Sequence, residues 1–281
     1  MSSLSHDRPG LAGLAICGLI VGCALLAPLI APHDPAAIDL GRRLLPPAWS
    51  DGGSMAFPLG TDELGRDMLS RLIYGSRVSL CVGIAASVVA GGLGFLLGMI
   101  SGYFSGLADR AISLVVDALL SLPLLLVMIT FSAILGQGFA SLVLVIGLTT
   151  WVTYARVTRS EVMSLKERPF VKAARAMGAS HASIILMHIA PNVLSTFIVL
   201  ATGGVASAIL AEASLGFLGF GMDSQTISWG AMLNDGRPYL ATSWWVAVLP
   251  GAAITLAILG VGLAGDLLRD RLDPRLRKVL S

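Results

Sequence analysis

The sequence predicts an all-α membrane protein with six transmembrane helices. Hydrophobic residues make up 55% of its 281 positions and charged residues only 13%, whereas a typical soluble domain carries about 25% charged residues. Six apolar runs follow one another along the chain, and most approach the roughly 20 residues that cross a hydrocarbon core about 30 Å thick. Lysine and arginine gather in alternate connections between these runs, which is typical of a multi-pass protein.

The apolar runs give the expected positions of the spans. The first, residues 10–31, follows a short N-terminal segment, 1–9. It is too long, and its flank too weakly basic, for a cleaved signal peptide, so we expect it to be retained. A predicted core over residues 78–268 holds the other five spans, and a basic tail follows at 269–281; the five spans are expected at residues 78–100, 112–135, 138–155, 193–214 and 244–265.

Two sequence features mark particular spans. Pro123 lies inside the third span and should kink its helix. Trp244 and Trp245 stand at the start of the sixth span, where paired tryptophans predict an aromatic belt at the membrane surface.

The connection at residues 32–77 has two parts of different character. Its first half is rich in proline, glycine and aspartate and predicts an extended loop outside the membrane. Its second half carries apolar residues at helical spacing, with charged residues on other faces. We therefore expect an amphipathic helix that lies at the membrane interface and leads into the second span; its apolar positions are Leu64, Met68, Leu69, Leu72 and Ile73.

The second span carries a row of glycines. Gly94, Gly98 and Gly102 lie four residues apart, and Gly91 precedes them by about one turn. Small residues at this spacing let two membrane helices approach closely. A generic glycine-rich membrane helix would explain the composition equally well, but the regular spacing favours a seam with a neighbouring helix.

An even number of spans places both ends of the chain on one side of the membrane. Of the 19 lysine and arginine residues, 13 lie on that side, including six in the connection that starts at Arg156. Because positively charged connections stay inside the cell, we expect both termini and residues 156–191 to be cytoplasmic.

Residue types that carry catalysis or hold metals do not cluster in the sequence. The three cysteines lie in apolar runs, and the four histidines and the acids form no set with ligand spacing. The Gly-x-x-x-x-Gly-Lys-Ser/Thr loop that cradles nucleotide phosphates is missing as well. We therefore expect no catalytic residue, no metal site, no cofactor bound by this chain and no enzyme activity.

Two acidic residues fall within the spans. Asp117 lies near the start of the third span and Glu212 near the end of the fifth. Acids at membrane depth usually face the bundle interior or an aqueous path, so both are candidates for a pathway or gating role. Their positions close to span ends are equally compatible with the membrane interface, and two acids are few for a proton relay.

The basic connection at residues 156–191 has a recognisable local pattern. Pro169 suits the first turn of a helix, since its missing N–H would be unpaired there. The helix should continue to Met177, and Gly178 can end it in a left-handed conformation at little cost. A second short helix should follow and end near Pro191. On local features alone this connection is either an ordinary solvated loop or a coupling helix that a soluble partner binds and moves.

This connection resembles the cytoplasmic EAA loop of ABC-importer permeases. That loop has Glu-Ala-Ala, a glycine four residues after the second alanine, and a terminal Ile-x-Leu-Pro. The matching positions here are Lys172-Ala173-Ala174, Gly178 and His188-Ile189-Ala190-Pro191. Lys172, His188 and Ala190 depart from the pattern, but the form Ala-Ala-Arg-Ala-x-Gly-Ala-Ser is typical of the dipeptide/oligopeptide/nickel branch.

Other segments are similar to the C-type permease of the same branch, in order along nearly the whole chain. The longest is Pro-Leu-Gly-Thr-Asp-Glu-Leu-Gly-Arg-Asp, which begins at Pro58 and precedes the second span. The others are His33-Asp34-Pro35, Leu215–Gly221, Ser228–Met232 and Gly265–Pro274. The chain is thus identified as resembling an inner-membrane permease of this branch.

The resemblance implies a type I ABC-importer permease fold in the cell inner membrane. It also implies four kinds of partner: a homologous second permease, two cytoplasmic ATP-binding subunits that use ATP, an extracytoplasmic solute-binding protein, and the membrane, with no nucleic acid. The ATPase-coupling residues it implies are Phe170, Lys172, Ala173, Ala174, Arg175, Gly178, His188 and Pro191.

The branch imports dipeptides, oligopeptides, nickel and other small solutes. Because this sequence shows no cage of metal ligands, small peptides are favoured over nickel. The rival from another class is a secondary transporter or channel that works alone, and a further alternative is a membrane subunit that only anchors partners. Dependence of uptake on ATP separates the importer from these rivals.

Overall fold

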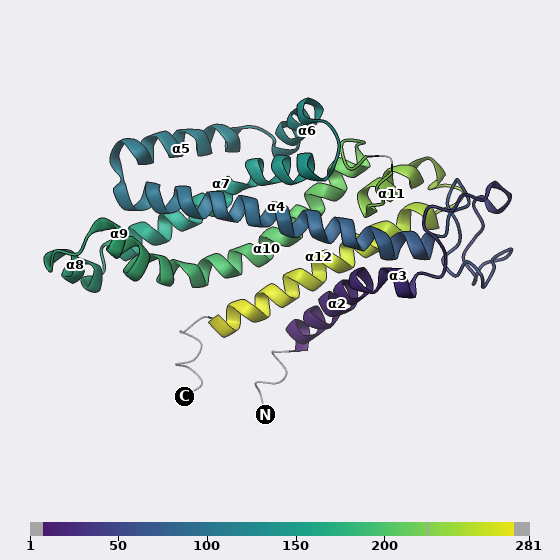
Figure 1. Ribbon diagram of the computed structural model, residues 1–281, viewed down its shortest axis with the longest axis horizontal. Helices are drawn as coiled ribbons and strands as arrows, with labels where there is room; N and C mark the ends of the chain where they lie inside the picture. Colours follow the sequence, from purple (N-terminus) through teal and green to yellow (C-terminus); the bar gives the residue numbers. More distant parts are fainter. Residues whose placement is uncertain (1–7, 224, 273–281) are drawn as a thin grey trace.

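The computed structural model describes residues 8–223 and 225–272, so residues 1–7 and most of the expected basic tail lie outside the described part. Within it the chain is helical, without a β-strand. Figure 1 shows the long helices side by side, with α8 and α9 at one end and α11 with the loop after α3 at the other. The helices long and apolar enough to cross a membrane are α2 (Arg8–Leu25), α4 (Met68–Phe104), α7 (Phe139–Lys166), α9 continued by α10 (His181–Phe217), and α12 (Trp245–Leu272).

Contacts between α4 and α7 establish six crossings. Gly94 of α4 faces Trp151 of α7, and Gly102 faces Val162, so the two helices run in the same direction. The chain must therefore return across the bundle between them. The returning segment is the bent pair α5 (Gly106–Ser121) and α6 (Leu124–Leu135), which counts as a sixth span. The predicted six-helix membrane fold is confirmed.

The third span is broken rather than kinked. The sequence predicts one helix over residues 112–135, but α5 already begins at Gly106, and α5 and α6 meet at 97°. Leu122 is extended, with φ −100° and ψ 145°, because the residue before a proline is disfavoured in a helix. Pro123 thus acts as a boundary between two helices.

The first and last helices close the bundle. A Cβ atom at Gly10 of α2 would meet Leu267 of α12, and one at Gly260 would meet Ile16, so the two helices run antiparallel. The start of α2 and the end of α12 therefore lie together, and both point toward the end of the bundle that holds α8 (Figure 1). That this end faces the cytoplasm stays a prediction from the distribution of positive charge.

The loop between α3 (Ala27–Ile30) and α4 contains only the single 3-10 turn Leu40–Arg42, so the expected amphipathic helix does not form a separate element: only its part from Met68 onward is helical, as the start of α4. Asp67 caps α4 by accepting a hydrogen bond from the Ser70 N–H at 2.9 Å. Gly60 and Gly65 have φ of +79° and +75°, which keeps the preceding residues out of a helix. Met68, the first residue of α4, is buried. The apolar spacing thus belongs to the first turns of a continuous span.

Trp245 anchors this loop. Its indole Nε1 donates to the carbonyl oxygen of Thr61 at 3.0 Å, and its side chain is buried. Trp244 is 41% exposed and suits the expected aromatic belt. Only one of the two tryptophans is therefore available to the membrane surface. The other fixes the start of α12 to the loop that precedes α4, close to α11 (Trp229–Gly236) and the 3-10 turn Arg237–Tyr239.

The glycine row of α4 is a seam with α7, as predicted. A Cβ atom at Gly98 would lie 2.6 Å from Thr158 Cβ and 2.7 Å from the Ala155 carbonyl oxygen, and Gly102 is equally crowded by Val162. Backbone atoms cannot yield at such distances, so only glycine permits this approach. The two helices pack along a large part of their length.

We expect Gly98→Ala to lower the thermal stability of the purified permease. The added methyl would force α4 and α7 apart, and overpacking of this kind costs about 1–3 kcal/mol. Gly92 is a matched control in the same helix, since a Cβ there meets no atom of the described residues within 4 Å. Gly92→Ala should be neutral or slightly stabilising, because alanine is the better helix former. Equal unfolding temperatures for the two variants would contradict the seam.

Candidate functional site

The candidate site at the α8 end is built on a short helix with well-defined ends. Helix α8 (Pro169–Ala176) begins with Pro169 in its first turn, as expected. At its other end Gly178 has φ +81°, its N–H donates to the Arg175 carbonyl, and the Ala179 N–H donates to the Ala174 carbonyl, both at 3.1 Å. These two bonds form a Schellman motif. The predicted left-handed glycine is confirmed.

One face of α8 is anchored to the bundle. Val171 and Ala174 are 0% and 3% exposed and pack in one apolar cluster with Val162 of α7 and Val193 of α10. Of the two alanines that the resemblance places in the coupling loop, Ala174 thus belongs to the core of this chain and Ala173 is exposed; their coupling role stays a prediction. A force on α8 is transmitted directly to two spans.

The opposite flank of α8 is apolar and open. Phe170, Ala173 and Met177 lie three or four residues apart, and all three are exposed, Met177 to 82%. Lys172 and Arg175 occupy the other exposed flank. Exposed apolar side chains that gather on one helix face mark a surface for a partner. The geometry thus favours a surface that binds a partner protein over an ordinary solvated loop.

Lys172, which stands where the family has glutamate, makes a local ion pair. Its Nζ lies 2.9 Å from Glu167 Oε2, and both side chains are more than 60% exposed. The hydrogen bond and charge of Lys172 lower the pKa of Glu167. Solvent screens such a pair strongly, so it contributes little to stability. Lys172 therefore helps to shape the turn before α8 without fixing it.

His188 and Pro191 lie within a continuous helical rod. The expected end of the second helix near Pro191 is wrong, because α9 (His181–Ser183) passes through the π-helical segment Ile184–Ile189 into α10 (Ala190–Phe217). The Ala190 N–H donates to the Ile185 carbonyl, five residues back, and Asn192 Nδ2 donates to the His188 carbonyl at 2.7 Å. A widened turn of this kind lets the helix pass a proline, which has no N–H to donate and crowds the preceding turn.

The two acids of the spans have different surroundings. Asp117 is exposed and pairs with Arg156 of α7 at 3.1 Å, next to a bidentate pair between Asp109 and Arg159 that also joins α5 to α7. Glu212 is 0% exposed and accepts a hydrogen bond from Ser79 Oγ at 2.9 Å. The structure thus brings neither acid to the coupling residues, and their predicted pathway or gating role stays a prediction.

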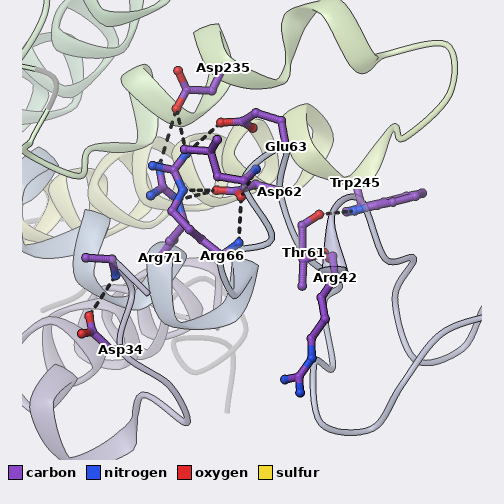
Figure 2. Close-up of polar contacts among 11 residues, drawn as sticks. Asp34, Arg42, Thr61, Asp62, Glu63, Arg66, Arg71, Asp235 and Trp245 are labelled. Carbon is purple, nitrogen blue, oxygen red and sulfur yellow. Dashed lines mark hydrogen bonds and ion pairs between the residues drawn. The ribbon is translucent and has the colours of Figure 1, made fainter. Parts of the chain in front are cut away.

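Sequence reasoning missed a cluster of charges at the opposite end of the bundle. Asp62 accepts from the backbone N–H groups of Leu64 and Arg66, both at 2.9 Å, and from Arg66 Nε at 2.6 Å. Arg66 Nη2 also donates to Glu63 Oε1 at 2.8 Å. Figure 2 shows Arg71 and Asp235 facing this group, Arg71 from the first turns of α4 and Asp235 from α11.

Burial changes the titration of the two outer carboxylates in this cluster. Burial, assisted by the negative charge of Asp62, raises the pKa of Glu63. Burial also raises the pKa of Asp235, although both arginines oppose it. The motif that begins at Pro58 pointed to this loop, but no sequence signal joined Arg71 to Asp235.

Comparison with known proteins identifies the class. The family model described as "Binding-protein-dependent transport system inner membrane component" matches residues 94–278, and the model "N-terminal TM domain of oligopeptide transport permease C" matches residues 1–47. The chain therefore belongs to the family of inner-membrane components of binding-protein-dependent transport systems. It is a multi-pass protein of the cell inner membrane.

Relatives similar over nearly the whole chain carry more specific names. The di/tripeptide transport system permease protein DppC of Pseudomonas aeruginosa is 43% identical over 98% of this chain and 91% of its own length. The dipeptide transport system permease protein DppC of Escherichia coli is 42% identical over 97% and 91%. The inward-facing MetNI methionine ABC transporter shares the fold, with a TM-score of 0.60 at 19% identity over 73% of this chain and 98% of that one.

We expect Glu63→Gln to raise the unfolding temperature at pH 7 by roughly 1–3 °C. Because the folded-state pKa of Glu63 is raised, its contribution to stability is full below the unfolded-state pKa and is lost as pH rises through the folded-state value. Glutamine keeps the acceptor for Arg66 without the buried charge. The gain should vanish near pH 4, where Glu63 is itself neutral. Asp51→Asn, at an exposed position of the same loop, is the control; a lower unfolding temperature for Glu63→Gln at pH 7 would contradict the sign.

Proposed function

We propose that this chain is the permease subunit of an ABC importer for di- and tripeptides, with ATP hydrolysed by partner subunits. The observation that carries the proposal is α8, a short helix with one buried and one open apolar flank at one end of the bundle. The substrate class is supported by the names of the relatives. Those called dipeptide or di/tripeptide permeases are 38–43% identical to this chain.

The open flank of α8 is the part that would bind an ATP-binding subunit. Phe170, Ala173 and Met177 would enter an apolar groove of that subunit, and Lys172 and Arg175 would lie at its rim. Rim charges steer association more than they strengthen it. The departure of Lys172 from the family glutamate is therefore compatible with coupling.

Movement of α8 would reach the membrane through two connections. On one side the turn after Lys166 joins it to α7, and on the other the helical rod from His181 joins it to α10. The buried contacts of Val171 and Ala174 hold α8 against both. Closure of two ATP-binding subunits on ATP would therefore rotate these spans as rigid bodies, which is how a local event opens a gate.

The remaining partners follow from surfaces that this chain leaves open. The outer faces of α5 and α6 carry exposed apolar side chains, among them Leu114, Leu126 and Ile134, which lipid or a homologous second permease would cover. The end that holds α11 and the loop at residues 32–67 faces away from α8 and would receive a solute-binding protein. A nickel importer is the alternative within the family.

We expect Met177→Asp to abolish ATP-driven dipeptide uptake by the reconstituted complex. Met177 is 82% exposed at the end of the open flank, and a charge there would be desolvated in the groove of the ATP-binding subunit, at a cost of several kcal/mol. The measurement is vanadate-sensitive uptake of a labelled dipeptide into proteoliposomes that contain all subunits, with the binding protein enclosed on the substrate side. Subunit content is checked by gel filtration.

Met55→Asp is the matched control. Met55 is exposed to 83%, almost the same as Met177, but lies in the loop at the other end of the bundle. The control should retain the ATP-binding subunits and their basal ATPase activity, both measured without the solute-binding protein, which would dock on the loop that holds Met55, whereas Met177→Asp should lose both. Normal uptake by Met177→Asp would remove α8 from the coupling site, and dipeptide uptake by this chain alone without ATP would favour the stand-alone transporter instead.

We expect Gly178→Val to reduce uptake at least tenfold and Gly178→Asn to retain most of it. Gly178 has φ +81°, which asparagine tolerates and a β-branched residue does not. A Cβ here meets no atom of the described residues within 4 Å, so any difference between the variants reports on backbone geometry. Equal losses in both variants would mean that a partner needs the space around Gly178.

A further inference from the structure

A cavity of about 500 Å³ lies at the end of the bundle opposite α8. Its walls come from the loop before α4, the first turns of α4, the segment after α10, and α11. Its volume falls within the roughly 300–1,000 Å³ of small-molecule sites. The charged residues that line it are Glu63, Arg66, Arg71, Asp223 and Asp235.

Arg71 is held by two ion pairs rather than by hydrogen bonds. Its side chain is only 6% exposed, and its guanidinium lies 3.3 Å from Asp62 and 3.6 Å from Asp235. Within the described residues it makes no hydrogen bond through its side chain, whereas the Arg66 guanidinium makes two. A guanidinium has five N–H donors, and buried donors without acceptors are costly. Arg71 therefore presents unused donors to the cavity that it lines.

The carboxylates are in surplus in the same cavity. Among the described residues, the three carboxylates of Asp62, Glu63 and Asp235 form their ion pairs with just two arginines, Arg66 and Arg71. Glu63 Oε2 is buried without a hydrogen-bond partner in the described residues. Asp235 is held loosely, 3.6–3.7 Å from both guanidinium groups, and is 39% exposed. The walls thus offer donors for an anion and a carboxylate for a cation.

We propose that this cavity binds a short peptide through its two free termini, with the α-carboxylate on Arg71 and the α-ammonium on Asp235. This rests on the proposed function and adds a receiving site for substrate on the extracytoplasmic side. A bidentate contact between carboxylate and guanidinium would supply the acceptors that Arg71 lacks. It would also release Asp235 from Arg71, which frees that carboxylate for the ammonium group.

A small ligand suits the site better than a loop of a docked protein. The charges line a concavity, whereas a stable protein interface needs about 800 Å² of surface from each partner. Arg71 in particular is too deeply buried for a broad, flat contact. A loop of the solute-binding protein on Arg71 is the alternative that the experiment separates.

The test measures binding of Ala-Ala to the complete transporter in nanodiscs by calorimetry, without ATP and without the solute-binding protein. Two analogues probe the termini: Ala-Ala-amide lacks the carboxylate, and N-acetyl-Ala-Ala lacks the ammonium group. We expect each analogue to bind at least tenfold more weakly than Ala-Ala. Equal binding of all three by the wild-type complex would overturn the proposal.

Variants assign each terminus to its residue. Arg71→Gln should bind Ala-Ala and Ala-Ala-amide equally, and Asp235→Asn should bind Ala-Ala and N-acetyl-Ala-Ala equally. Arg43→Gln is the control, because Arg43 is exposed and bonds Tyr239 on the same side of the molecule; it should keep both preferences. If the Arg71→Gln complex does not assemble, the proposal is decided by the analogue binding of Asp235→Asn and by the preference of the wild-type complex for Ala-Ala over both analogues.

The outcomes also separate this site from the proposed function. Vanadate-sensitive dipeptide uptake without any terminal preference in binding would overturn the site and leave the importer standing. Terminal preferences that persist in Arg71→Gln and Asp235→Asn would also overturn the site. Weaker binding of the solute-binding protein to Arg71→Gln, without any change in peptide binding, would assign Arg71 to docking. Absence of dipeptide uptake by the wild-type complex would instead contradict the function.

Discussion

The close parallel packing of α4 on α7 is the contact on which the rest of the structure depends. Three glycines bring the two backbones together, and membrane helices associate mainly through such packing because lipid is as apolar as the side chains. Two parallel neighbours require the chain to return between them, which is the role of α5 and α6. The same contact directs the end of α7 toward α8, so the candidate coupling site is a consequence of this seam.

Local signals predicted the parts of the site that depend on neighbouring residues. Pro169, Gly178 and the spacing between them gave the bounds of α8, because a proline at the first turn and a glycine after the last are direct consequences of backbone chemistry. The glycine seam of α4 was predictable in the same way, because the regular spacing of its glycines is itself a local feature of the sequence. The resemblance of several sequence motifs to ABC-importer permeases predicted the family, and both family matches agree with that prediction.

Features that depend on distant residues were not predictable in this way. Ala174 is indistinguishable from Ala173 until Val162 and Val193 are seen to cover it. The pairing of Arg71 with Asp235 joins the start of α4 to α11, and no periodicity encodes such a contact. The apolar spacing at Leu64–Ile73 predicted a separate helix before the second span, whereas the helix begins only at Met68 and continues into that span; Asp67, which caps it, marks a start that spacing alone does not give.

The length of α4 has a mechanical consequence. Its 37 residues extend over about 55 Å at 1.5 Å per residue, well beyond a hydrocarbon core of about 30 Å. Near one end Arg71 reaches the charged cavity, and near the other the Tyr103 hydroxyl lies 2.7 Å from His181 Nδ1, at the start of the rod that follows α8. One continuous helix, α4, thus has one end at the charged cavity, where solute would bind, and the other end beside α8 and α9, where an ATP-binding subunit would bind. The glycine seam lies close to the Tyr103 end, since Gly102 is its neighbour, so a tilt of α4 about the seam would leave that end almost in place and would move the Arg71 end by much more.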